Sequence, residues 1–206
     1  MLGLYIGIIL LLNIPYVQHR MSVLVAKELS TVLGSELTVG RINIGLLNRI
    51  IIDDLVLNDQ SGKELLKIGR LSAKFEILPL FSGKISIGNV QLFSFNANLE
   101  RPTPQASTNF QFVLDAFASK DTVKKKSNLD LRINSLLIRR GKVSYDVLSA
   151  ESTPGKFNPQ HIRLSNILAN VSLKALQNDS VNAAIKRMSV EEEHSGFELK
   201  KLSLKI

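Results

Sequence analysis

The sequence of 206 residues contains no cysteine and no tryptophan, and only 6% of its residues are aromatic. Without cysteine the chain can hold no disulfide framework, no thiolate metal site and no lipid-modified N-terminal cysteine. Lys and Arg outnumber Asp and Glu by 26 to 18, which gives a net charge of +8. The basic residues are spread along the sequence, with no run longer than Lys124 to Lys126, and no nucleic-acid-binding motif is present, so we expect no nucleic-acid partner.

Motifs of catalysis and metal binding are also missing. His19, His161 and His194 stand far apart in the sequence, and none lies in a recognised metal-binding motif. Phosphate-binding glycine loops, nucleophile elbows and HExxH are absent. We interpret Asp53-Asp54 as a solvated pair and Glu191 to Glu193 as the surface of a turn. The sequence therefore predicts no enzyme, no metal, no cofactor and no small-molecule substrate.

The N-terminal segment carries the longest apolar run. Residues 2–17 (LGLYIGIILLLNIPYV) contain no charge, and their length lies between that of a signal-peptide core and that of a membrane span. Polar residues follow and no small-x-small cleavage site is present, so we expect an uncleaved transmembrane anchor over 1–17. A buried core helix is the alternative. The apolar residues of the anchor include Leu4, Ile6, Ile8, Ile9, Leu10, Leu11 and Leu12.

A second helix is predicted over 18–34, because apolar residues recur there at spacings of three and four and Gly34 is a helix stop. Its polar face is only weakly basic, so we expect it to pack on the first strands rather than lie on a bilayer. Arg20 and Lys27 follow the anchor while no Lys or Arg precedes it. Charge alone therefore weakly favours a cytoplasmic body.

From residue 35 a period of two begins, and one template, Φ-x-Φ-x-x-Φ-x-Φ, occurs seven times. The segments are 37–44, 66–73, 85–92, 131–138, 162–169, 183–190 and 197–204. The two polar central positions shift the apolar residues from odd to even positions, or the reverse, which in a regular strand would place them on the opposite face of the sheet. Either each strand has a bulge or bend there, which keeps the apolar face continuous and curves the sheet, or the two halves bury against different partners. A two-layered β fold with a packed core is the structural alternative.

The fold class expected is mainly β: the two helices, then a curved antiparallel sheet forming a repeating β-groove. We assign 35–100 to a first β-groove unit, 101–128 to a linker and 129–206 to further strands. In the linker, Ser107 or Thr108 is expected to cap a short helix bearing Phe110, Val113, Leu114 and Phe117. Because the repeat stops at Lys205-Ile206 in mid-strand, we expect a fragment of a longer chain.

The order of these motifs resembles a known family. The helix ending in Leu33-Gly34, then LTVGRINI from Leu37, IDDLVLND from Ile52, GKELL from Gly62 and ISIGNVQL from Ile85, resembles the N-terminal region of AsmA-like and TamB (translocation and assembly module) proteins. RGKVSYD from Arg140, HIRLSNI from His161 and SGFELKKL from Ser195 are similar to the versions in Bacteroidetes-type bacteria.

This resemblance implies a bacterial inner-membrane protein, single-pass, with its body in the periplasm, against the weak charge signal. It implies a groove that holds or conducts phospholipid between the inner and outer membranes, with phospholipid acyl chains and an outer-membrane β-barrel as partners. The alternative is a structural or assembly subunit for outer-membrane proteins that pairs through a β edge. Expected groove-lining residues are Val39, Ile42, Ile68, Leu71, Ile85, Ile87, Phe93, Phe95, Ile133, Val143 and Ile167.

Overall fold

The computed structural model describes residues 2–45, 48–76, 86–117, 132–177 and 180–205. The described part of the chain is mainly β, with helices at its N-terminus and in the middle. The elements in order are α1 (Leu2–Leu12), α2 (Pro15–Leu33), β1 (Leu37–Gly45), β2 (Arg49–Asn58), β3 (Glu64–Glu76), β4 (Ser86–Arg101), α4 (Gln111–Phe117), β5 (Arg132–Val147), β6 (His161–Gln177), β7 (Ser180–Glu192) and β8 (Glu198–Lys205).

The apolar N-terminal run is divided between two helices. Ile14 is extended, with φ −64° and ψ 131°, because Pro15 disfavours a helical conformation in the residue before it, and Pro15 then opens α2. Asn13 stabilises the break by donating from Nδ2 to the carbonyl oxygens of Ile9 and Ile44, at 2.8 and 2.7 Å. The expectation of one continuous helix over 1–17 is therefore corrected: α1 has 11 residues.

Across the described ranges, no helix combines the length and the hydropathy that a bilayer crossing requires.

Helix α2 packs on β1, as the sequence predicts. Gln18, Ser22 and Leu33 of α2 are buried, and Gln18 donates from Nε2 to Oδ1 of Asn43 over 2.6 Å. The helix ends at Gly34, whose φ of 63° is the left-handed conformation that glycine adopts without strain. The predicted helix stop is confirmed.

The eight strands form one sheet in sequence order, β1 to β8. Neighbours are antiparallel except β4 and β5, which run parallel. The prediction of a wholly antiparallel sheet is therefore wrong at one pair. A parallel pair needs a crossover of a dozen or more residues, and residues 102–131, between these strands, provide the length.

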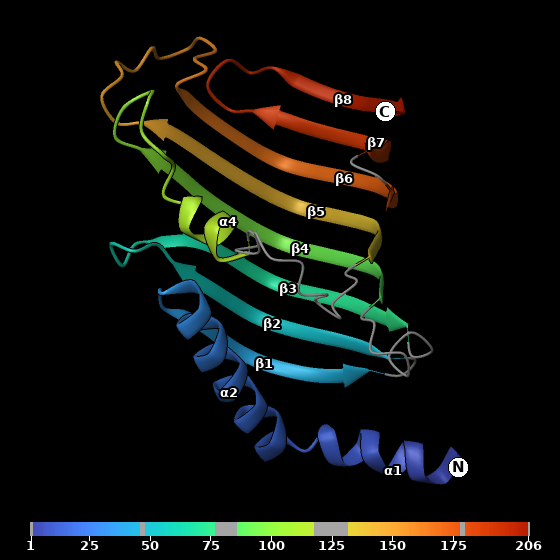
Figure 1. The fold of residues 1–206 in the computed structure, drawn as a ribbon. Helices are drawn as coiled ribbons and strands as arrows, with labels where there is room; N and C mark the ends of the chain where they lie inside the picture. The colour runs from blue at the N-terminus through green and yellow to red at the C-terminus, as the bar shows by residue number, and fades with distance from the viewer. Residues whose placement is uncertain (1, 46–47, 77–85, 118–131, 178–179, 206) are drawn as a thin grey trace.

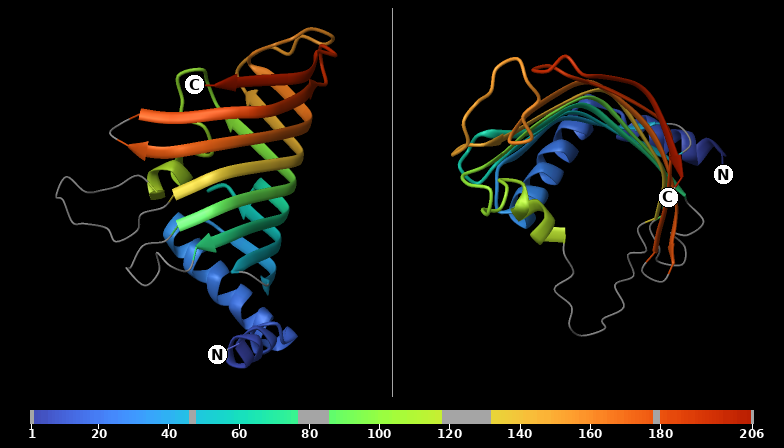
Figure 2. Two further views of the ribbon diagram at one scale, coloured as in Figure 1. Left: turned by 90° about the vertical axis from the view of Figure 1, so that its right-hand side faces the viewer. Right: turned by 90° about the horizontal axis from the view of Figure 1, so that it is seen from above.

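The sheet is bent into an arc, and α2 and α4 both lie inside the arc (Figures 1 and 2). The core sits there, where Leu33 of α2 meets Leu37, Leu57 and Leu65. The register shifts by one residue after Leu57, so β3 gains a residue at Leu65, which joins Leu66 in this core. The concave face of the sheet is thus its apolar face.

The short helix expected in the linker is present as α4. Phe110 and Val113 pack against the core, together with Phe112 and Ala116. Leu114 was expected on the apolar side but is 53% exposed, because α4 has only two turns and Leu114 lies on the side away from the sheet. The side chain of Phe117 lies outside the described residues, as do residues 118–131.

Candidate functional site: the concave apolar face

Two rows of apolar side chains cross the whole sheet at right angles to the strands. The first row, from β1 to β8, is Ile42, Ile52, Leu71, Leu92, Ile138, Ala169, Met188 and Leu202; the second is Ile44, Ile50, Ala73, Val90, Leu136, Val171, Ile185 and Leu204. Every member is directly paired with the next across the strands. Seven inter-strand spacings of about 4.8 Å give each row a length of about 34 Å.

These rows stay on one face because the strands bend together. On either side of the bend, Val39 pairs with Leu55 and Arg41 pairs with Asp53. The register between β1 and β2 is therefore unchanged, and no residue is inserted. In β1 and β3 the two central residues of the template, Gly40-Arg41 and Gly69-Arg70, face outward, and the apolar residues on both sides of them face inward. The predicted bend is thus confirmed at the template centre in these strands, whereas in β4 and β5 it lies further along the strand, at Phe93-Ser94 and Arg139-Arg140.

Left-handed residues produce the bend. Asp54, Ser94, Arg140 and Asn166, in β2, β4, β5 and β6, have φ between 51° and 56°, a conformation that costs an L-residue about 1 to 2 kcal/mol. Glycine stands opposite the first two. A Cβ on Gly40 would lie 3.0 Å from the Cβ of Asp54, and one on Gly69 would lie 3.3 Å from the Cβ of Ser94. The glycines of β1 and β3 therefore make room for the kinked residues of β2 and β4.

True bulges occur elsewhere in the sheet. Between Lys74 and Phe75 the register with β4 shifts at Gly88, the position where the template predicts it. Register shifts also occur in the pairs β5–β6, β6–β7 and β7–β8. Both devices predicted from the parity switch, bend and bulge, are therefore used.

Most of the apolar face is only half-buried. Within the two rows, Ile42, Ala73 and Ala169 are buried, whereas Leu71, Leu92, Ile138, Val171 and Met188 keep partial exposure and Leu204 is 46% exposed. Among the described elements, the helices lie at the β1 end and beside the core. Large exposed apolar patches on folded proteins mark interaction surfaces or ligand-binding grooves, which makes this face the candidate site.

The sequence-predicted lining residues mostly lie on this face. The pairing of strands brings Val39, Ile42, Ile68, Leu71, Phe95, Val143 and Ile167 to the concave side. Ile85 lies outside the described residues, and so do the side chains of Ile87 and Ile133. Sequence reasoning missed Ile50, Ile52 and Met188, although their alternation in the strand carried the signal.

Phe93 is the exception and is corrected. It pairs with Arg70 and Arg139 on the outer face, where the guanidinium carbon of Arg139 lies 5.9 Å from its ring centroid. There it lines a depression of about 730 Å³ that includes Arg41 and Asp53. After the parity switch that the template placed at Gly88-Asn89, Leu92 faces inward and Phe93 therefore faces outward; the overlooked second switch at Phe93-Ser94 returns Phe95 to the inner face.

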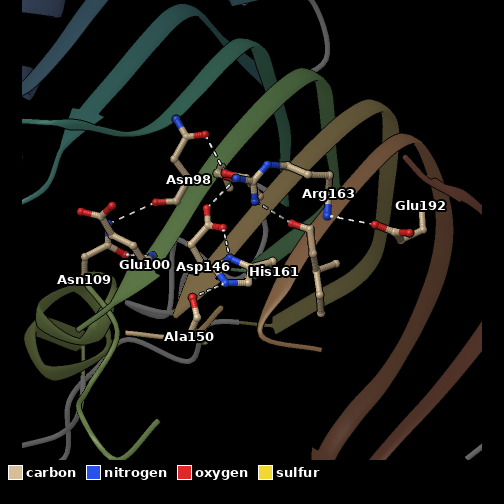
Figure 3. A network of polar contacts seen from close by, with 11 residues as sticks. Asn98, Glu100, Asn109, Asp146, Ala150, His161, Arg163 and Glu192 are labelled. Carbon is tan, nitrogen blue, oxygen red and sulfur yellow. Dashed lines mark hydrogen bonds and ion pairs between the residues drawn. The ribbon is translucent and has the colours of Figure 1, made fainter. Parts of the chain in front are cut away.

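The outer face is polar and held by ion pairs. Arg70 donates from Nε to Oδ1 of Asp53 over 2.6 Å. Asp146 lies between two residues of β6 (Figure 3): its Oδ1 is 2.9 Å from Nδ1 of His161 and its Oδ2 is 2.8 Å from Nη2 of Arg163. Nε2 of His161 is 3.1 Å from the carbonyl oxygen of Ala150. Both ring nitrogens thus face acceptors, which favours the doubly protonated imidazolium.

The titration behaviour follows from these contacts. The hydrogen bond to Asp146, then that to the Ala150 carbonyl, raises the pKa of His161 above its ordinary value. Burial opposes ionisation of Asp146, but hydrogen bonds from Arg163 and His161 outweigh it and lower the pKa of Asp146. The cluster joins the loop after β5 to β6 and is structural in character.

Glu192, at the end of β7, is a second buried polar feature. It was expected on the surface of a turn, yet its side chain is only 2% exposed. Ser195 donates from its backbone nitrogen to Oε2 of Glu192 over 2.7 Å, so the carboxylate closes the turn between β7 and β8. Burial opposes its ionisation, but the hydrogen bonds from Ser195 and neighbouring amides lower the pKa of Glu192 to about 2.

Within the described ranges no three His, Asp or Glu side chains converge to hold a metal ion. The two apolar rows make the concave surface the candidate site. Compared with known proteins, the sequence matches no protein-family model and no curated protein.

Proposed function

We propose that the concave face holds or conducts phospholipid by its acyl chains. The observation that carries the proposal is the pair of apolar rows, which cross all eight strands without a polar residue. A β-sheet leaves an apolar face open to water only at a cost, and acyl chains offset that cost by about 0.8 kcal/mol for each buried CH₂ group. Head groups remain in water along the open side.

The dimensions support this assignment. Each row is about 34 Å long, and the hydrocarbon core of a bilayer is about 30 Å thick. An extended acyl chain therefore finds apolar partners along its whole length. No residue needs to perform chemistry, since the site is a surface rather than a constellation of reactive groups.

The setting that we propose is the bacterial envelope, with the protein held at the inner membrane by its apolar N-terminus and the sheet in the periplasm. The resemblance to AsmA-like and TamB proteins supports this setting, as does the exposure of Ile6, Leu10 and Leu11 on α1. Apolar side chains that the fold leaves uncovered are available to lipid.

One observation favours a second function, assembly of outer-membrane proteins. Among the described strands β8 pairs only with β7, so its other side presents backbone donors and acceptors for an added strand. A proline in place of Lys201, which is exposed and outside the register with β7, would abolish capture of a barrel partner under this function. The same change would leave lipid binding intact.

Photocrosslinking with a matched control tests the lipid proposal. Ile138 and Leu137 are adjacent in β5 and both half-buried, but Ile138 faces inward and Leu137 pairs with Gln91 and Asn170 on the outer face. A photoreactive amino acid at Ile138 should yield phospholipid adducts by mass spectrometry after purification from bacterial envelopes, and one at Leu137 should not. Absence of adducts at Ile138 in a protein with the wild-type circular dichroism spectrum rejects the proposal.

A further inference from the structure

The helix α2 has two faces of different character. Ser22, Ala26, Leu29 and Leu33 face the sheet or the core and are buried or half-buried. The opposite face is uncovered: Tyr16, Val23 and Leu24 are 66%, 51% and 61% exposed, and Arg20 and Lys27 are exposed as well. The spacing from Tyr16 through Arg20, Val23 and Lys27 follows the helical repeat, so these residues form one stripe.

Exposed apolar residues also occur on α1 and at the break that follows it. Ile6, Leu10, Leu11 and Ile14 are between 44% and 66% exposed, and α1 contains no charged residue. The hydrogen bonds of Asn13 to Ile9 and Ile44 connect the break between the helices to β1. The break between the two helices is therefore held at a fixed position beside β1. We call α1 and the outer stripe of α2 the helical platform.

The chemistry of the helical platform is that of a lipid interface. Arg20 donates from Nε to the hydroxyl oxygen of Tyr16 over 3.1 Å, and its guanidinium carbon lies 5.4 Å from the ring centroid. Aromatic rings with a polar tip and long basic side chains occupy the boundary between lipid tails and head groups. The charges match anionic head groups, because α1 and α2 together contain two basic residues of the Lys and Arg type, Arg20 and Lys27, and one acidic residue, Glu28.

We propose that the helical platform lies flat in the surface of a bilayer containing anionic phospholipid, with α1 embedded between head groups and tails and with Arg20 and Lys27 bound to phosphates. This inference rests on the proposed function only for its setting at a membrane, since the helical platform and the concave face are separate surfaces. It also places the β1 end of the apolar rows next to lipid. Ile44, whose carbonyl accepts from Asn13, begins the second row, so that end is the entrance for acyl chains.

The first experiment uses charge. The full chain is mixed with vesicles of phosphatidylcholine, with or without phosphatidylglycerol, and binding is measured by co-sedimentation. We expect preference for the anionic vesicles and loss of about fivefold in affinity for each of Arg20→Gln and Lys27→Gln, because a basic residue near such a surface contributes about 1 kcal/mol. The control removes the same charge far away, with Lys200→Gln and Lys201→Gln in exposed positions of β8.

Equal loss from the β8 variants would mean that net charge alone attracts the vesicles, and it would overturn the proposal. Equal binding to both vesicle types would overturn it as well. Ile138→Asp on the concave face separates the two proposals: it should lower the amount of bound phospholipid, by excluding it from the strands beyond β5, and leave vesicle binding unchanged. If the wild-type chain does not bind anionic vesicles, but a photoreactive residue at Ile138 still forms phospholipid adducts, only the proposal for the helical platform is rejected.

The second experiment uses the absence of tryptophan from the chain. A single tryptophan at Leu10 or Leu24 should shift its emission to the blue when anionic vesicles are added, as the indole leaves water. A tryptophan at Leu148, which is 58% exposed in the loop after β5, should not shift. A shift at Leu24 that grows with protein concentration without vesicles would show that a second copy covers the stripe, which contradicts the proposal.

Discussion

The ring of Phe95 in β4 lies directly on Gly141 in β5. A Cβ built on Gly141 would come 2.1 Å from Cε1 and 2.8 Å from Cζ of Phe95, distances that no side chain tolerates. Gly141 adjoins the kinked Arg140, which has a φ of 54°, and it pairs with Ile167 of β6. Phe95 thus fills the inside of the bend where β4 and β5 run parallel, and it does so only because β5 has no side chain there.

We expect Gly141→Ala to lower the free energy of unfolding by about 1 to 3 kcal/mol, the usual cost of forcing extra volume into a packed site. Urea denaturation followed by circular dichroism measures the change. In the background of Phe95→Leu the penalty should shrink by about 1 kcal/mol or more, because the smaller side chain vacates the space. An unchanged penalty in that background would show that the cost arises from the backbone of β5 rather than from the ring.

The left-handed residues make a second stability prediction. Ser94 has a φ of 54° and is exposed on the outer face, so its conformation, rather than its packing, sets the effect of substitution. Ser94→Gly should raise the free energy of unfolding by about 0.5 to 1 kcal/mol, since glycine relieves the strain but loses more entropy on folding. Ser94→Val should lower it by about 1 to 2 kcal/mol, because a β-branched side chain is least tolerant of positive φ.

Substitutions at Gln91 test whether the effects at Ser94 arise from its positive φ. Gln91 lies three residues earlier in the same strand and is not among the residues with positive φ. Gln91→Gly should lower the free energy of unfolding and Gln91→Val should leave it almost unchanged. If Ser94 and Gln91 respond alike in urea denaturation, the bend does not depend on a strained residue.

The strands and their bend were predictable from the sequence because they rest on local alternation of apolar and polar residues. Two kinds of feature were not. The parallel pairing of β4 and β5 depends on where a long connection returns the chain, which no local pattern encodes. Phe93 and Phe95 lie on opposite faces because of a second parity switch whose central residues, Phe93-Ser94, are not both polar. Hydrophobicity alone therefore assigned Phe93 to the wrong face.

The N-terminal helices and Glu192 illustrate a related limit. The apolar run is uniform in composition, and the division at Asn13 and Pro15 arises from one backbone constraint and one side chain that reaches β1. Glu192 belongs to a run of three glutamates, and only the tight turn that follows selects the middle one for burial. In both cases a contact distant in sequence or specific to a turn decides the outcome.

Glu192 makes a prediction about acid stability. Because the pKa of Glu192 falls from 4.5 to about 2, its stabilisation is present in full above 4.5 and is lost as the pH falls through the folded value. Glu192→Gln should lower the free energy of unfolding at neutral pH by about 1.5 to 3 kcal/mol, the range for hydrogen bonds to a charged group. Urea denaturation between these pH values should show a shallower acid dependence in the variant. Glu193→Gln, at an exposed neighbour, is the control and should leave the curve unchanged.

His161 makes the opposite prediction. Its pKa is raised from 6.5 by Asp146, so the stabilisation is present in full below the ordinary pKa and is lost as the pH rises through the folded value. His161→Gln should therefore cost stability in mildly acidic buffer and little in alkaline buffer, with a difference of about 0.5 to 1 kcal/mol for a partly exposed ion pair. His194, which is exposed, supplies the control variant. A cost of His161→Gln that is independent of pH would assign the residue a packing role only.

The apolar rows make the prediction that separates a conduit from a set of independent lipid sites. If acyl chains enter beside Ile44 and move along the rows, a carboxylate in the middle strands should interrupt them, since burying an unpaired charge is strongly unfavourable. In Ile138→Glu, a photoreactive residue at Leu71 of β3 should still form phospholipid adducts, whereas one at Met188 of β7 should lose them severalfold. Leu137→Glu adds the same charge to the outer face and should leave both sites unaffected. Undiminished adducts at Met188 in a folded Ile138→Glu protein would mean that lipid reaches β7 without passing β5, and the concave face would then be a holder rather than a path.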